Sequence, residues 1–341
     1  YLQKNTRYVS IQLGIGGWQP YDAKYVASKG YGDCKALSNY MFSLLKEAGI
    51  PAYYTVIKAG DDERDIYTEF PSSQFNHVIV CVPLNKDTVW LECTDQNKPT
   101  GYMGSFTGNR HALLITENGG KLVRTPKYGL NENLQVRHVK AKLDEEGTLQ
   151  MTTNSLYEAE QQDDVNDVIN YLSKEKVKEY LHRHFDFGTY DITAFDYKQN
   201  KGDLPSVDEQ LGIAVSNYAT ITGKRLFVTP NVMTKSKLRL AENENRKYDI
   251  VLNYEYRDID SVEIELPAGY EPETKPQDVS LSGKFGKYNS SVKLSGNKLY
   301  YYRHMEQYGG RYPAKDYADF VKYFEAVYKA DHARVVLVKK E

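Results

Sequence analysis

The chain has 341 residues, 40% of them hydrophobic and 26% charged, which predicts a globular protein of about two domains. Its formal net charge of -2 argues against a nucleic-acid-binding surface as the main function. No apolar run approaches the roughly 18 residues that span a bilayer, and three cysteines are too few for a disulfide framework. The 30 tyrosines favour strand-rich structure, with a sugar- or peptide-binding face as the less favoured explanation.

The first third of the chain mixes α and β signals. Residues 1–5 resemble the last turn of a helix whose beginning lies outside the sequence, and a short strand at 7–11 and a turn-rich loop at 13–20 follow. An apolar stripe at helical spacing then predicts an amphipathic helix with Asp33 as N-cap and Gly49 just after its end. Further on we expect a strand at 52–59 and a hairpin formed by the apolar runs 78–82 and 89–93. Residues 1–128 therefore read as one α+β domain.

The remaining residues, 129–341, are predicted to form a β-rich, sandwich-like domain with helical insertions. The expected elements are a hairpin at 135–143 and 148–157, a helical pair at 163–171 and 174–184, strands at 190–197, 212–221, 237–241, 248–256 and 261–266, a hairpin at 292–294 and 299–304, a closing helix at 316–328 and a last strand at 333–339.

Cys34 is the first candidate for chemistry. It stands at the first helical position after Asp33, where unpaired backbone N–H groups and the helix dipole favour a thiolate. A thiolate is a good nucleophile once a base and an orienting group accompany it. The alternative is a small buried core residue, which is how most free cysteines behave.

The hairpin supplies a candidate base and its partner. If the turn centres on Lys86, His77 lies opposite Asp95, so a carboxylate could fix the tautomer of the imidazole. A register change of one residue would instead place Thr94 or Gln96 opposite His77. The alternatives are a strand-end histidine bonded to backbone and an aspartate that starts a turn.

These motifs resemble the transglutaminase-like superfamily. The resemblance rests on residues 30–35 (GYGDCK) with the helix behind them, residues 48–52 (AGIPA), residues 75–78 (FNHV) and residues 90–95 (WLECTD). More narrowly, the segments 7–11 and 17–20, and softer motifs at 227–231, 266–270 and 330–331, resemble bacterial envelope proteins with a transglutaminase-like core between two β-rich domains. The resemblance implies a core in which the nucleophile helix packs on an antiparallel sheet, and a missing N-terminal β-rich domain.

The implied chemistry is cysteine-dependent. Cys34 would attack an amide carbonyl of a peptide or protein, His77 would move the proton, Asp95 would orient the imidazole, and a thioester would pass the acyl group to an amine or to water. We nominate the backbone N–H of Cys34 and the side chain of Gln19 as oxyanion donors, with Trp18 as a weaker candidate and packing beside Pro20 as the alternative for both.

The resemblance also implies a periplasmic or cell-envelope location, substrates that could be linked to cell wall or polysaccharide, and no calcium dependence. We expect no cofactor and no metal, since no motif has metal-ligand spacing. Cys81 and Cys93 are predicted to be buried thiols that lie diagonally on the hairpin, out of disulfide reach. The competing hypothesis is a non-catalytic binding or assembly module for polysaccharide, peptide or a partner protein, because members of this superfamily include inactive folds.

Overall fold

The computed structural model describes residues 1–11, 16–61, 63–85 and 87–340. The predicted loop at 13–20 lies partly outside these residues. The chain forms an α+β protein dominated by sheets and divides into two units. The first holds residues 1–128 with 201–205, and the second holds residues 129–200 with 206–341. Among the described residues, no helix has both the length and the apolar character needed to cross a membrane.

The first unit is built on a five-stranded antiparallel sheet. Its strands follow the order β5-β4-β3-β6-β7, with β3 Tyr53–Ile57, β4 His77–Pro83, β5 Thr88–Leu91, β6 His111–Thr116 and β7 Gly119–Arg124. The short strands β1 Arg7–Tyr8 and β2 Tyr31–Gly32 pair in parallel. The helices are α1 Leu2–Asn5, α3 Ala23–Lys29, α4 Cys34–Glu47 and α5 Gly104–Thr107.

Helix α4 covers one face of this sheet. Its apolar residues Ala36, Leu37 and Tyr40 form a buried cluster with Val80 and Val82 of β4. The predicted helix is confirmed at both ends, since Asp33 caps the N-terminus and Gly49 follows the C-terminus with φ +73°. A second cluster around Ile79, Trp90 and Met103 fills the other face of the sheet. The sheet therefore has a core on both faces, and α4 is fixed on one of them.

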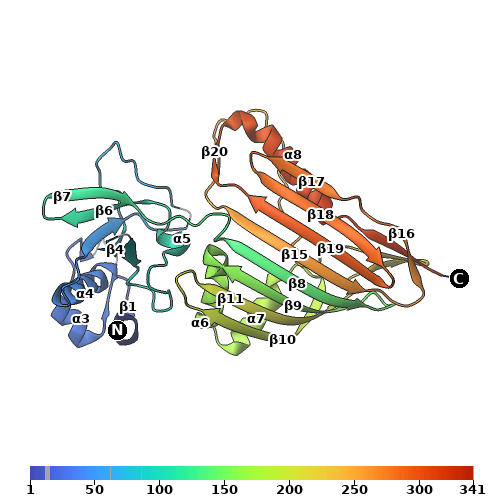
Figure 1. The fold of residues 1–341 in the computed structure, drawn as a ribbon, viewed down its shortest axis with the longest axis horizontal. Helices are drawn as coiled ribbons and strands as arrows, with labels where there is room; N and C mark the ends of the chain where they lie inside the picture. The colour runs from blue at the N-terminus through green and yellow to red at the C-terminus, as the bar shows by residue number, and fades with distance from the viewer. Residues whose placement is uncertain (12–15, 62, 86, 341) are drawn as a thin grey trace. The chain divides into compact units, whose positions relative to one another are not determined.

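The second unit is dominated by one eight-stranded sheet, which Figure 1 shows as a long twisted surface. Its strand order is β10-β11-β9-β8-β15-β19-β18-β17. The strands are β8 Leu134–Leu143, β9 Leu149–Glu158, β10 Thr189–Asn200, β11 Ser206–Ser216, β15 Tyr256–Glu265, β17 Val279–Gly283, β18 Gly286–Ser295 and β19 Lys298–Gln307. Neighbouring strands are antiparallel except for β8 and β15, which are parallel.

Smaller elements cover one face of this large sheet. Four strands pair in the order β12-β13-β21-β16, namely β12 Thr220–Thr222, β13 Arg225–Val228, β21 Val335–Lys339 and β16 Tyr270–Thr274, and β14 Ile250–Leu252 pairs with β20 Gly310–Tyr312. The helices are α6 Asp163–Tyr171, α7 Lys174–His184 and α8 Tyr317–Asp331. The main core joins the large sheet to β13, β21 and α7, and a second cluster seats α8. Strand β9 shows the resulting pattern, since its buried and exposed residues alternate along most of its length.

A buried ion-pair cluster lies on the covered face of the large sheet. Arg303 of β19 donates from Nε to Asp331 at 3.1 Å and from Nη1 to Asp260 at 3.0 Å, and Asp258 lies 3.8 Å from the same guanidinium. Burial opposes the charge of Arg303, but these carboxylates outweigh it and hold its pKa well above the usual value. Burial raises the pKa of Asp258 to about 6, against the opposing effect of Arg303. The cluster therefore joins β15, β19 and the end of α8 through charges that depend on one another.

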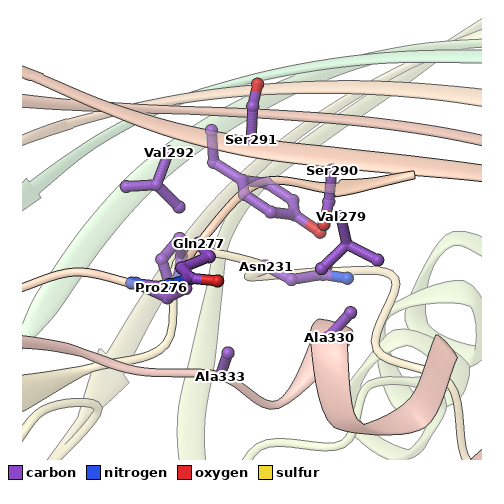
Figure 2. Close-up of a pocket in the computed structure, with 11 residues that line it drawn as sticks. Asn231, Pro276, Gln277, Val279, Ser290, Ser291, Val292, Ala330 and Ala333 are labelled. Carbon is purple, nitrogen blue, oxygen red and sulfur yellow. The ribbon is translucent and has the colours of Figure 1, made fainter. Parts of the chain in front are cut away.

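A small pocket opens beside this cluster (Figure 2). Ser290, Val292 and Tyr301 of the large sheet line it together with Ala330 and Ala333 at the end of α8. It has room for about one water molecule. It is therefore too small for a peptide or sugar substrate.

Most predicted elements of the second unit are confirmed. The helical pair at 163–171 and 174–184 has the expected bounds, and the hairpin of β8 and β9 is present. The strand predicted at 237–241 was wrong, because that segment pairs with no neighbouring strand. The strand predicted at 248–256 is divided between β14 and the start of β15, and the one predicted at 212–221 ends at Ser216.

Candidate active site

Cys34 is the first residue of α4. Its predecessor Asp33 has extended backbone, and one carboxylate oxygen of Asp33 accepts a 3.0 Å hydrogen bond from the backbone N–H of Ala36. This cap satisfies one of the four free N–H groups of the first turn and leaves the others near the sulfur. The thiol is 8% exposed. Cys34 therefore lies mostly buried at the N-terminal end of α4.

Gly32 allows strand β2 to pass very close to the first turn of α4. Strand β2 pairs with β1, and the backbone N–H of Val9 donates to Gly32 at 2.9 Å. A Cβ atom at residue 32 would come within 2.7 Å of the Cβ of Ala36 in the first turn of α4. A side chain at this position would push the strand away from the helix and displace Cys34.

Lys35 follows Cys34 and turns back toward Asp33. Its Nζ lies 2.5 Å from Oδ2 of Asp33, and both side chains are 3% exposed. A lysine is almost never this buried unless a partner neutralises it. Asp33 and Lys35, the residues directly before and after Cys34, thus form one buried ion pair at the start of α4.

His77 begins β4 and is buried. It pairs with Ile57 of β3, and the side chain of its neighbour Asn76 bonds to both backbone groups of Ala59, at 2.7 and 2.9 Å. The ring of Phe106 packs edge-on against the imidazole at 5.3 Å between centroids. The strand end and the phenyl ring together hold the imidazole in place.

Glu92 is the carboxylate that meets His77. Its two oxygens lie 2.9 and 3.1 Å from Nε2 of the imidazole, and one of them also accepts from the backbone N–H and the hydroxyl of Thr94, at 3.0 and 2.6 Å. The side chain is 2% exposed. Every partner is a donor, so the carboxylate is held in its ionised form and in a fixed orientation.

Asp95 does not contact His77. Its Oδ1 accepts from the backbone N–H groups of Asn97 and Lys98, at 2.7 and 3.1 Å, which makes it a turn residue. The expected register was wrong by one residue, because Leu84 and Asp87 close the turn and Val80 pairs with Leu91. Pairing also stops at Leu91, so Asp95 lies beyond the ladder.

Three side chains thus come together as cysteine, imidazole and carboxylate. Burial opposes a charge on His77, but the Glu92 carboxylate, which is also hydrogen-bonded to the ring, and the nearby Cys34 outweigh it and raise the pKa of His77 above 6.5. Burial acts against Glu92 as well, but His77 and Thr94 outweigh it and lower the pKa of Glu92. Such an arrangement can hold an imidazolium beside a sulfur nucleophile.

Tyr54 of β3 adds a polar group on the face of the sheet that α4 covers, because it pairs with Val80 of that face. Burial, and then the charges of Cys34 and Asp33, raise the pKa of its phenol. Within the described part of the chain, its buried hydroxyl has no hydrogen-bond partner. An unpaired buried donor near a nucleophile is available to a bound substrate.

The nominated oxyanion donors have exposed side chains. Trp18 is 42% exposed and Gln19 is also exposed, and in the part of the chain that the structure describes neither hydrogen-bonds to His77 or Glu92. Across the same described ranges, no cluster of three or more potential metal ligands occurs.

Cys81 and Cys93 are buried free thiols, as predicted. They belong to the clusters on opposite faces of the sheet, so they do not share the hairpin face that the expected register gave them. Burial raises the pKa of Cys81 to about 11 and also raises that of Cys93. Both thiols are therefore unreactive controls for Cys34.

Sequence reasoning missed Glu92, Lys35, Tyr54 and Phe106. A signal for Glu92 was present, because a hairpin centred between residues 85 and 86 places Glu92, which directly follows β5, diagonally across from His77. The contact of Phe106 with His77 had no comparable signal, since α5 and β4 are separated in sequence and only the folded chain brings them together.

The comparisons with known proteins concern the fold. A family model described as "Domain of Unknown Function with solved-structure structure (DUF3858)" matches residues 224–337, within the second unit. No curated protein matches the chain. A crystal structure described as "a putative protease from Parabacteroides distasonis ATCC 8503" resembles the chain with a TM-score of 0.51 and 12% sequence identity, over 99% of this chain and 50% of that one. The chain thus shares its overall fold with half of that protein.

Proposed function

We propose that this chain is a transglutaminase-like enzyme with a papain-like core, which cleaves or transfers the acyl group of a peptide-like amide. The observation that carries the proposal is the buried His77 imidazole, which is hydrogen-bonded to Glu92 through Nε2 and lies close enough to Cys34 for the cysteine to affect its pKa. Glu92 takes the orienting role that the sequence assigned to Asp95.

The first half-reaction forms a thioester. The Cys34 thiolate attacks the carbonyl carbon, a C–S bond forms, and the carbonyl electron pair moves onto oxygen. The backbone N–H of Cys34 is one donor to this oxyanion, and the Tyr54 hydroxyl, Gln19 and Trp18 are the candidate side-chain donors. When the carbonyl re-forms, the C–N bond breaks and the His77 imidazolium gives its proton to the leaving amine.

The second half-reaction regenerates the enzyme. Neutral His77 takes a proton from water or from an acceptor amine as that molecule attacks the thioester carbonyl. The C–S bond then breaks and the thiolate leaves, beside the re-formed imidazolium. Water gives hydrolysis and an amine gives transfer. We also propose a periplasmic or envelope location, on the strength of the resemblance, to be tested by cell fractionation with an antibody against the chain.

The test is the pH dependence of Cys34 alkylation by iodoacetamide, with the modified site assigned by mass spectrometry. We expect Cys34 to react well below the pH at which an ordinary thiol of pKa about 8.5 does, and to lose this advantage in His77→Ala. Cys81 and Cys93 serve as internal controls. Reaction of Cys34 as an ordinary thiol in both proteins would contradict the proposal and favour a non-catalytic binding module.

A further inference from the structure

The N-cap of α4 places a negative charge beside the nucleophile. Asp33 is buried, caps α4 through Ala36 and precedes Cys34 directly in the chain. The charges of Asp33 and Cys34 both act on the phenol of Tyr54, so the two groups share one small region. A carboxylate this close to a sulfur disfavours the thiolate, because two like charges in a poorly solvated site repel one another.

Lys35 offsets this charge. Its ammonium group lies 2.5 Å from the Asp33 carboxylate, and neither side chain has appreciable contact with solvent. Nζ also lies close to Gly16, at 3.5 Å from the position that a Cβ on that glycine would take. The side chain is therefore enclosed at the start of α4, where solvent screens its charge little.

The charged groups in the neighbourhood of Cys34 form two neutral pairs. Asp33 and Lys35 come from the start of α4, His77 comes from β4 with Glu92 behind it, and the uncharged Tyr54 comes from β3. Without Lys35, these surroundings would carry one uncompensated negative charge.

We propose that Lys35 is a positioning residue of the active site, which neutralises Asp33 and so keeps the Cys34 thiolate accessible at neutral pH. This inference rests on the proposed role of Cys34 as nucleophile. It assigns to Lys35 an electrostatic task distinct from the proton transfer of His77 and from the capping of α4.

The experiment measures the ionisation of Cys34 in the full chain. Thiolate absorbance in the ultraviolet, taken as the difference from Cys34→Ala, needs no reagent access, and alkylation rates give an independent profile. Lys35→Met should raise the pH midpoint by about one unit or more, which is a tenfold loss of thiolate below the midpoint. Lys46→Met, an exposed lysine at the other end of α4, is the matched control and should leave the midpoint unchanged.

Two further variants separate charge from folding. Asp33→Asn keeps a good N-cap residue and removes the charge, so the midpoint should fall below that of the wild type. Asp33→Asn combined with Lys35→Met removes both charges and should return the midpoint toward the wild type. If Lys35→Met alone does not fold, the other two variants still decide the question.

An unchanged midpoint in folded Lys35→Met, or an unchanged or raised midpoint in Asp33→Asn, would overturn the inference. A failure of the proposed function looks different. In that case the wild-type midpoint is that of an ordinary thiol and does not respond to His77→Ala, whereas a midpoint that responds to His77 but not to Lys35 contradicts this inference alone.

Discussion

Glu92 binds the Nε2 atom of His77 through both of its carboxylate oxygens, at 2.9 and 3.1 Å. The same carboxylate is anchored by Thr94, and the ring of Phe106 packs against the imidazole at a steep angle. The orientation of the ring is therefore set by contacts that do not involve the cysteine.

Glu92→Gln should disable the site, whereas Asp95→Asn should not. Loss of the carboxylate charge lowers the pKa of His77, so the imidazolium that supports the thiolate is lost at neutral pH. We expect a fall of about tenfold or more in Cys34 alkylation at neutral pH for Glu92→Gln. Asp95→Asn should behave like the wild type, because Asn keeps the turn bonds. If Asp95→Asn reduced Cys34 alkylation more than Glu92→Gln does, Asp95 and not Glu92 would be the residue that orients His77.

Tyr54→Phe tests the buried hydroxyl. If this group donates to the oxyanion, its loss should slow the acylation of Cys34 by a reactive ester by roughly tenfold or more, with little change in the pH midpoint of the thiol. Tyr53→Phe is the matched control, because Tyr53 packs with the cluster on the opposite face of the sheet. Equal acylation rates for the two variants would exclude Tyr54 as a donor.

Asp258 should make the second unit more stable in mild acid. Its pKa is about 6 in the folded chain and about 3.9 when unfolded, so the folded state binds more protons between these values. Stability therefore falls as the pH rises from about 4 to above 6, by about 3 kcal/mol. Asp258→Asn keeps an acceptor for Gln161 and should remove this slope. The free energy of unfolding in urea is measured for the wild type and the variant across this pH range. If it depends on pH equally in both proteins, the prediction is wrong.

Arg303→Met should strongly destabilise the second unit. The substitution leaves the buried Asp331 carboxylate without its cationic partner and leaves Asp260 with Arg137 alone, at 3.9 Å, which costs about 3–5 kcal/mol. Arg311→Met removes an arginine from an exposed pair with Asp249 and should cost less than about 1 kcal/mol. Denaturant titration of both variants measures the difference. A similar small loss in both would show that the cluster contributes little.

Local signals predicted much of the fold. The helices α6 and α7 and the hairpin of β8 and β9 follow from apolar periodicity and from turn residues that lie within each segment. The hairpin of β6 and β7 was missed, although Asn118 and Gly119 are a signal for such a turn. The segment 237–241 shows the limit of these signals, because an extended, apolar sequence becomes a strand only where a neighbouring strand is available.

The candidate site was predicted in part. Cys34 and His77 were identified from a helix start and a strand start, and the structure brings them together. Asp95 was chosen in place of Glu92 as the partner of His77 because the hairpin register depends on the closing turn. A shift of one residue in that turn changes every opposing pair. The contacts of Lys35 and Tyr54 depend on side-chain direction and burial, which a single sequence does not specify.

The parallel pairing of β8 with β15 has a consequence for how the second unit folds. Strands β8 to β11 form one antiparallel group within residues 134–216, and β15, β17, β18 and β19 form another within residues 256–307. Within each group, paired residues lie at most 66 positions apart in the chain (215 − 149), whereas the seam between the groups pairs residues 123 positions apart (257 − 134). We expect this seam to limit the folding rate, so that weakening it slows folding, whereas weakening the outer strands mainly speeds unfolding.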